Sequence, residues 1–355
     1  MSYTNGLDNP ELFFQTKLYT GTGSSQSITL DGDENMQPDW VWLKDRSATN
    51  GHFLYDSVRT ATKELNAQTT QTEQTKSGGL TAFGSDGFTI GDYTGHNDNS
   101  TNYVSWNWKA GTSFSNDASA TGVGTIDSTG SVSTDVGISI MSYTGNGSNS
   151  ASFAHGLGVK PQIVLIKNRS TGKNWVYWQD TTGNGTSDVR LILNGNNSNY
   201  DNYHVTFGTS TITLGNTDDA WNKSGDNLIA YCFAEKKGYS KFSGSYTGNG
   251  NADGTFVYTG FRPAFVMVKA SSATGYWLIK DNKRTNSFNV VDGNLYPNIS
   301  DAEDTGSVAY VDFTSQGFKL RGTYAAMNTN GQTNIYMAFA ESPFVNSKGV
   351  PCNAR

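Results

Sequence analysis

The residue types that could do chemistry are few and scattered in this chain. Its four histidines lie far apart, and no two have the spacing of metal ligands: His52, His96, His155 and His204. The chain lacks a Gly-x-Ser-x-Gly nucleophile elbow, a phosphate-binding Gly-Lys-Ser/Thr loop and a His-Glu-x-x-His helix. The sequence therefore identifies no catalytic residue and no cofactor, and we expect a protein that is not an enzyme.

The segment 31–35, Asp-Gly-Asp-Glu-Asn, gathers oxygen ligands of the kind that calcium prefers. It does not match the twelve-residue calcium loop, and related parts of the chain carry no equivalent acids. A solvated turn is the simpler interpretation, so we predict no metal there.

One charge pattern recurs along the chain. Lysine is followed by aspartate and arginine at identical spacing in Lys44, Asp56, Arg59 and in Lys269, Asp281, Arg284, and the middle copy has Lys167 and Asp180, with Gly183 in place of the arginine. In a hairpin, the strand rise would put Asp56 roughly 13 Å from Lys44. A local contact between aspartate and arginine is therefore favoured over a lysine–aspartate pair. A carboxylate pair that cuts polysaccharide needs two acids about 5 to 10 Å apart, and the sequence identifies none.

Aromatic side chains are the remaining candidates for binding, because Tyr and Trp present an apolar face and a polar edge to a sugar. Most of them lie in apolar, strand-like segments, which predicts core positions. The better candidates for glycan binding lie in loop-like segments rich in Asn, Asp and Gly: Tyr93, Tyr200, Tyr203, Trp221 and Tyr324.

The elements that must position these residues repeat three times. The tripeptide Tyr-Thr-Gly begins at residues 19, 143 and 246, and each copy is followed by a proline and, six residues after it, a lysine that ends an apolar strand. A period of roughly a hundred residues is domain-sized and far longer than a solenoid unit. We predict repeat 1 at 1–110, a Gly/Ser/Thr linker at 111–136, repeat 2 at 137–238, repeat 3 at 239–345 and a tail at 346–355.

Each repeat contains the same run of expected strands. Segments 40–43, 163–166 and 265–268 are four consecutive apolar residues, typical of a strand covered on both faces. A polar turn and an aromatic strand follow, which predicts a hairpin, and a strand of six residues or so closes the unit. The segment 111–136 has no Trp, Tyr or Leu, so we expect it to form no core and to leave repeat 1 separable.

Composition agrees with this organisation. The 40 glycines, 12% aromatic and only 16% charged residues are typical of turn-rich all-β domains. The fold class that follows is all-β, with tandem antiparallel β-sandwiches of the jelly-roll or lectin-like kind.

No apolar run is long enough to span a bilayer and no signal peptide is evident, so we expect neither membrane insertion nor secretion. Without a basic stripe, nucleic acid is not an expected partner, and Cys232 and Cys352 are expected to be free thiols.

Several segments resemble virion surface proteins of tailed, often marine, bacteriophages, described as tail fibre or structural proteins. The resemblance is carried by Gly-Ser-Tyr-Thr-Gly-Asn-Gly at 244–250, Thr-Gly-Phe-Arg-Pro at 259–263, residues 317–321, and the ending Tyr-Met-Ala-Phe-Ala-Glu-Ser-Pro-Phe at 336–344. Residues 143–170 are similar to a companion repeat, and segments 38–44, 55–59 and 103–109 to the first. The resemblance covers nearly the whole chain and implies a non-enzymatic protein at the virion surface, with other virion proteins as partners.

The expected function is a tail fibre or spike adhesin that contacts host-surface glycan. One alternative is a decoration protein of the capsid or tail, since the first repeat begins near residue 14 and leaves little room for a particle anchor or fibrous shaft. A glycan depolymerase is the other alternative. By analogy with phage adhesins and decoration proteins, a homotrimer is expected.

Overall fold

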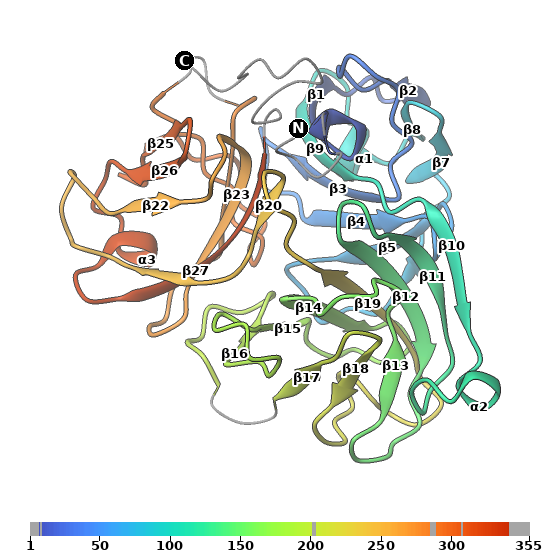
Figure 1. Ribbon diagram of the computed structural model, residues 1–355. Coiled ribbons are helices and arrows are strands. Elements are labelled where there is room, and N and C mark those ends of the chain that lie inside the picture. The colour runs from blue at the N-terminus through green and yellow to red at the C-terminus, as the bar shows by residue number, and fades with distance from the viewer. Residues whose placement is uncertain (1–6, 8, 201–203, 285–288, 307, 341–355) are drawn as a thin grey trace.

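In the computed structural model the chain forms three lobes around a common centre (Figure 1). The structure describes residues 7, 9–200, 204–284, 289–306 and 308–340. Every pairing between its named strands is antiparallel, and each lobe combines a large sheet with a sheet of three strands. The predicted all-β, sandwich-type fold is confirmed. The predicted tail at 346–355, Cys352 and Tyr203 lie outside the described residues.

Repeat 1 has a six-stranded sheet and a three-stranded sheet. In spatial order the large sheet is β1 (Phe14–Thr20), β9 (Asn102–Trp108), β3 (Trp40–Asp45), β4 (His52–Asp56), β5 (Lys63–Asn66) and β6 (Gln74–Thr75). The small sheet is β2 (Gln26–Ile28), β8 (Gly87–Ile90) and β7 (Leu80–Gly84), and the short helices are η1 (Pro10–Leu12) and α1 (Thr94–Asn97).

Repeat 2 has a seven-stranded sheet. Its order is β10 (Thr112–Asn116), β11 (Ser128–Ser133), β12 (Ile138–Thr144), β19 (Asn227–Phe233), β14 (Ile163–Asn168), β15 (Val176–Gln179) and β16 (Val189–Ile192). The small sheet is β13 (Ser152–Ala154), β18 (Thr211–Leu214) and β17 (Val205–Phe207), and helix α2 is Ala118–Thr121.

Repeat 3 follows the same plan. Its large sheet is β20 (Ser240–Lys241), β27 (Thr333–Ala340), β23 (Pro263–Ala270) and β24 (Leu278–Asp281), and β21 (Ser245–Thr247) also pairs with β27. The small sheet is β22 (Phe256–Tyr258), β26 (Gly317–Leu320) and β25 (Val311–Thr314), and helix α3 is Ala325–Asn328. None of the helices in the described part of the chain has the length and apolar character to cross a membrane.

The central strands are buried on both faces, as their apolar runs predict. In β3, Val41 and Leu43 pack against the small sheet of repeat 1. The alternate residues Trp40 and Trp42 point the other way, into a core to which all three repeats contribute. Each large sheet is therefore covered by its own small sheet outside and by the neighbouring repeats inside.

The shared core is rich in aromatic pairs that cross from one repeat to the next. Ring centroids are 4.7 Å apart for Trp40 and Tyr231, 5.5 Å for Trp108 and Phe265, and 6.3 Å for Phe233 and Phe339. Aromatic side chains bury large apolar areas, and pairs of this geometry add stabilisation beyond area alone. Repeat 1 is thus part of one common core, and the expectation that it is separable is wrong.

Residues 111–136, predicted to be a linker, instead form β10, α2 and β11. Strand β11 pairs with β12 along its whole length, and β10 pairs with β11, so the segment extends the large sheet of repeat 2. The side chains of Ile126 and Val132 are buried. Serine, threonine and glycine supply backbone hydrogen bonds as well as any residue, and a free sheet edge is enough to order them.

Each Tyr-Thr-Gly tripeptide ties a strand that pairs with the closing strand of its repeat (β1, β12 or β21) to a short turn before that closing strand. The tyrosine hydroxyl donates to a backbone carbonyl there: Tyr19 to His96 (2.8 Å), Tyr143 to Trp221 (2.7 Å) and Tyr246 to Met327 (2.9 Å). A Cβ on the glycine would lie 2.1, 2.3 or 2.4 Å from a backbone carbonyl oxygen in Gly21, Gly145 and Gly248 respectively. The tripeptide is therefore a packing motif, in which only glycine allows this approach.

Candidate functional site

A repeated lysine crosses each of the three seams between lobes. We call the contacts of repeats 1 and 3 the first seam, those of 2 and 1 the second, and those of 3 and 2 the third. The lysine Nζ donates to a carbonyl of the neighbouring repeat: Lys44 to Ser300 (3.2 Å), Lys167 to Thr70 (3.0 Å) and Lys269 to Asn197 (2.8 Å). Burial lowers the pKa of Lys44 and Lys269 to about 8 and that of Lys167 to about 7. A lysine at the same position of each repeat thus links that repeat to its neighbour, and the three links close the lobes into a ring.

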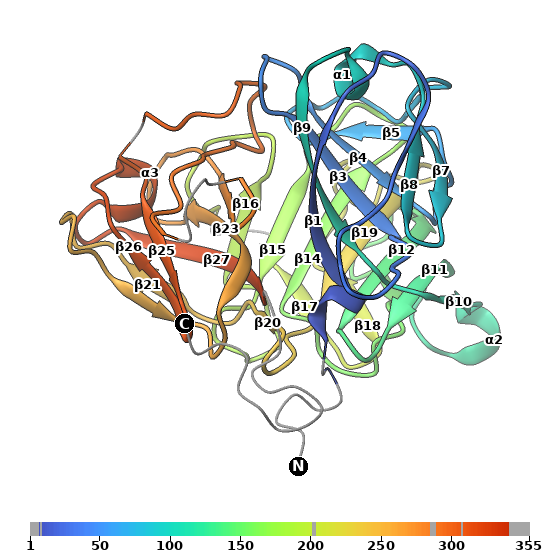
Figure 2. The same cartoon turned by 90° about the horizontal axis from the view of Figure 1, so that it is seen from above.

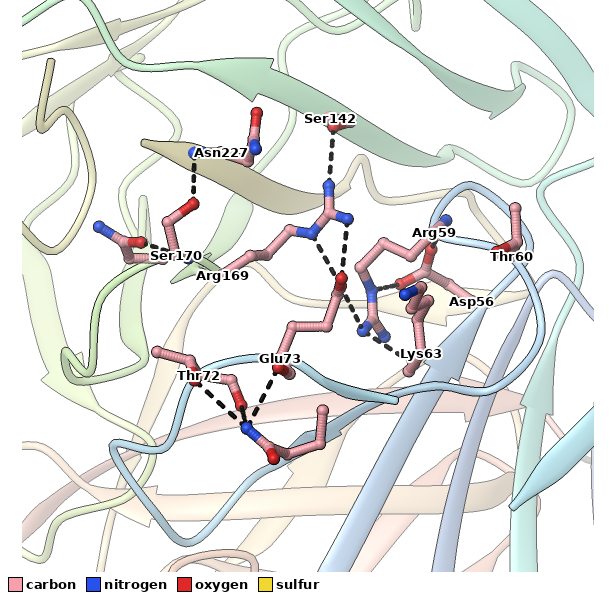
Figure 3. Close-up of polar contacts among 12 residues, drawn as sticks. Asp56, Arg59, Thr60, Lys63, Thr72, Glu73, Ser142, Arg169, Ser170 and Asn227 are labelled. Carbon is pink, nitrogen blue, oxygen red and sulfur yellow. Dashed lines mark hydrogen bonds and ion pairs between the residues drawn. The ribbon is translucent and has the colours of Figure 1, made fainter. Parts of the chain in front are cut away.

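The second seam contains a buried ion network (Figure 3). Asp56 Oδ2 accepts from Arg59 Nε at 2.5 Å, which confirms the local Asp-to-Arg contact predicted from the spacing. Glu73 lies between two guanidinium groups, 3.3 Å from Arg59 Nη1 and 2.8 Å from Arg169 Nε. Burial would raise the pKa of Glu73, but hydrogen bonds and charge from Arg169 and Arg59 outweigh it and lower that pKa. Because Arg169 belongs to repeat 2, the network fastens the two lobes together.

The first seam repeats this network with different residues. Arg284 Nε lies 2.5 Å from Asp281 Oδ2, and Glu303 bridges Arg284 (2.6 Å) and Arg46 of repeat 1 (2.7 Å). In both seams the aspartate also accepts from the closing strand of the next repeat. Tyr231 OH lies 2.6 Å from Asp56, and Trp106 Nε1 lies 2.9 Å from Asp281.

In the part of the chain that the structure describes, the third seam has no matching aspartate–arginine–glutamate network. The β14–β15 register places Gln179, and not Asp180, opposite Ile163, where Asp56 faces Trp40 and Asp281 faces Phe265. The match made from the sequence between Asp180 and the aspartates Asp56 and Asp281 was therefore offset by one residue. Asp180 instead accepts from Gly183 and Gly185 in its own turn, while Gln179 accepts from the Tyr177 hydroxyl. The ion networks of the first and second seams are structural, since their polar groups are turned toward one another and not toward a ligand.

Trp221, one of the predicted glycan-binding residues, is buried, with 1% of its surface exposed. The prediction that it lies exposed in a loop is therefore wrong. It occupies the turn whose carbonyl Tyr143 binds, and its ring meets Trp178 edge-on at 5.1 Å. Arg190 lies 5.1 Å from the Trp221 ring and 5.3 Å from that of Tyr200, whose exposed fraction is 36%. Tyr200 is thus the outward member of this group.

Tyr93 and Tyr324 occupy matching places, each just before the short helix of its repeat. Tyr93 is half-buried and borders a hollow of about 390 Å³ with Thr75, Asp92 and other residues, and Lys76 Nζ lies 4.9 Å from its ring centre. Tyr324 is half-buried against the core of repeat 3. The structure places Tyr93, Tyr200 and Tyr324 on three different lobes, and a glycan role for each stays a prediction.

A more exposed aromatic surface lies on the small sheet of repeat 3. Phe256 and Tyr258 of β22 are 46% and 63% exposed, while Val257 between them is buried in the core of that repeat. Strand pairing sets Phe256 opposite Lys319, and Lys319 opposite Asp312, in one row across the sheet. Directly opposed residues of an antiparallel pair share a face, so the aromatic pair and these charges form one surface.

Charged side chains frame this surface. Lys319 Nζ lies 2.8 Å from Asp253, and Arg321 lies 3.3 Å from Asp312 and 4.0 Å from Asp253. We call Phe256, Tyr258, Lys319, Arg321, Asp253 and Asp312 the β22 face. It belongs to β22, β26 and β25 on the outer side of the lobe, away from β3 and β14 in both views (Figures 1 and 2).

Sequence reasoning missed the β22 face, although a signal was present. The register places Ile28 of β2 and Phe153 of β13 where β22 has Val257. The residues at the position of Phe256 are therefore Ser27, which is exposed, and Ser152, which is buried. Comparing copies at outward positions would have revealed large aromatic side chains in repeat 3 alone.

The acidic segment 31–35 lies at the surface, and Asp31 pairs with Lys17. Within the ranges that the structure describes, no three His, Cys, Asp or Glu side chains gather as metal ligands.

The fold and its surfaces define a class: three antiparallel β-sandwiches closed into a ring by three seams within a single chain, each crossed by a lysine at the same position of the repeat. The profile of one family, described as a domain of unknown function (DUF7483), matches residues 9–343. The match spans almost the whole chain, which therefore belongs to this family. A search of curated proteins gave no significant match.

Proposed function

We propose that this chain is a non-enzymatic surface protein of a tailed-bacteriophage particle, a tail fibre or spike adhesin that contacts host-surface glycan through the β22 face. Its support is the exposed pair Phe256 and Tyr258, together with the resemblance of the repeats to phage virion proteins. Its other partners would be virion proteins, and its place the virion surface.

The chemistry of the β22 face suits a carbohydrate. Exposing large aromatic rings to water is unfavourable, so a pair of them on an outer sheet face favours an interaction surface. A sugar ring can stack its C–H groups on Phe256 and Tyr258, while the charged side chains beside them bind hydroxyl groups. Stacking on an outer sheet face gives a shallow site, suited to repeated weak contacts with a cell surface.

The experiment combines location and competition. Intact particles are imaged with an antibody against the protein, and purified protein is tested for blocking adsorption to host cells. Label at the tail together with blocking by native protein, but not by a Phe256→Ala/Tyr258→Ala variant, is the expected result. Antibody label elsewhere on the particle, together with no blocking of adsorption by the purified protein, would refute the adhesin role.

A second candidate, decoration of the capsid or tail, is favoured by the ring of three similar lobes. A pseudo-threefold unit with one rigid core can match a threefold position of a shell without forming a homotrimer itself. Label over the capsid lattice would support that role.

A further inference from the structure

The third seam differs from the other two in a way that opens a cavity. Arg46 and Arg169, each two residues after the repeated lysine, correspond to Ser271 in repeat 3. The backbone N–H of Glu303 bonds to the Arg46 carbonyl (2.9 Å) and that of Glu73 to the Arg169 carbonyl (3.1 Å).

At the third seam the equivalent bond runs from Asn199 N–H to the Ser271 carbonyl at 2.7 Å. Asn199 therefore stands where the other seams have a bridging glutamate, and Ser271 where they have its arginine partner. Two long charged side chains are replaced by two short neutral ones, and the space that they would fill stays open.

That space is a cavity of about 500 Å³ between repeats 2 and 3, widely open to solvent on one side. Its lining consists of Thr181, Asp188, Val189, Ser198, Asn199, Ser245, Ser271, Ser272, Thr333 and Ile335. The volume falls within the range of small-molecule sites. Hydroxyl groups, which both donate and accept hydrogen bonds, dominate the wall.

The lining also determines the charge of a ligand. Among the described residues it contains no lysine or arginine, and the one charged group there is the Asp188 carboxylate, so an anion would meet repulsion without compensation. Both Asp188 carboxylate oxygens already accept from Thr181, and each keeps a further lone pair for a hydroxyl donor. Ser198 and Ser245 make no side-chain hydrogen bond among the described residues, and Val189 and Ile335 supply apolar wall.

We propose that the third seam is a second binding site, which takes a small, uncharged, polyhydroxylated molecule such as one neutral sugar unit. The hydroxyl groups of the ligand take the place of the charged side chains at the other two seams. Ligand binding thus joins repeats 2 and 3, between which the described residues form no such ion network. This site is separate from the β22 face and does not depend on its function.

The test uses saturation-transfer NMR with glucose, galactose and N-acetylglucosamine, and with glucose 6-phosphate as the charged probe. The background is the full chain carrying Phe256→Ala/Tyr258→Ala, so that only the seam is examined. At least one neutral sugar should receive saturation, and glucose 6-phosphate should receive less than glucose does.

Restoring the charges of the other seams is the decisive change. In Ser271→Arg/Asn199→Glu the new side chains fill the cavity, and saturation of the neutral sugar should be lost in the folded protein. If this variant does not fold, Ser245→Leu, at an exposed position of the wall, should weaken the signal at least threefold. Absence of saturation by every neutral sugar, an unchanged signal in a folded filled variant, or equal binding of the phosphate would overturn the proposal.

Discussion

Neutralising Glu73 tests whether the ion network fastens repeats 1 and 2. Arg169 holds this carboxylate with two bonds, from Nε at 2.8 Å and from Nη2 at 3.0 Å. The side chains of Arg169 and Glu73 are only 19% and 15% exposed. Exposed pairs contribute about 0–1 kcal/mol, whereas breaking a fully buried pair costs about 3–5 kcal/mol. For this intermediate burial we expect Glu73→Gln to lower the free energy of unfolding by about 2 kcal/mol.

The assay is urea unfolding followed by tryptophan fluorescence, completed as a double-mutant cycle with Arg169→Gln. The cycle isolates the pair from other effects of each substitution, and we expect a coupling energy of about 1–2 kcal/mol. Glu34→Gln is the matched control, because Glu34 is exposed and makes no ion pair among the described residues. If Glu73→Gln costs no more than Glu34→Gln, the network does not hold the seam and the reasoning fails.

Three further predictions concern the core and the sheet. Burial lowers the pKa of His96 and His155 to about 4. As the pH falls, the unfolded chain binds protons on these histidines at a higher pH than the folded protein does. The free energy of unfolding is therefore full above about pH 6.5 and falls toward pH 4, by up to about 3 kcal/mol per histidine. Urea midpoints that do not move across this window would contradict it. The Cys232 thiol is buried and its pKa is raised by burial to about 12, so a thiol reagent should modify it only after unfolding, and rapid labelling of the native protein would refute this. A Cβ on Gly130 would lie 1.9 Å from the Ile140 carbonyl oxygen, so Gly130→Ala should cost about 1–3 kcal/mol in thermal or urea unfolding, whereas a linker would tolerate it unchanged.

The threefold repeat and its main strands could be predicted because they rest on local patterns. Four consecutive apolar residues before Lys44, Lys167 and Lys269 leave no polar face, and a strand of that kind must be covered on both sides. The sequence did not show what covers the second face. That cover comes from residues about a hundred positions away, such as Tyr231 over Trp40.

The errors in the candidate site have the same origin. Trp221 follows two aspartates and an alanine, a polar context typical of a loop, yet its turn is tied to the core by Tyr143. The segment 111–136 lacks large apolar residues, but β11 needs only the free edge of β12 to become a strand. In both cases a long-range contact overrides local composition.

The measurement that tests the central claim most directly is the affinity of purified protein for host-surface polysaccharide, by calorimetry, with and without the β22 aromatic pair. The Phe256→Ala/Tyr258→Ala variant should bind at least tenfold more weakly, about 1.4 kcal/mol, with an unchanged melting temperature because both rings face solvent. Tyr93→Ala tests the rival prediction from the sequence, and if the β22 face is the glycan site, this variant of another lobe should bind as the native protein does. Equal affinity of the double variant and the native protein, or a loss confined to Tyr93→Ala, would contradict the assignment of glycan binding to the β22 face.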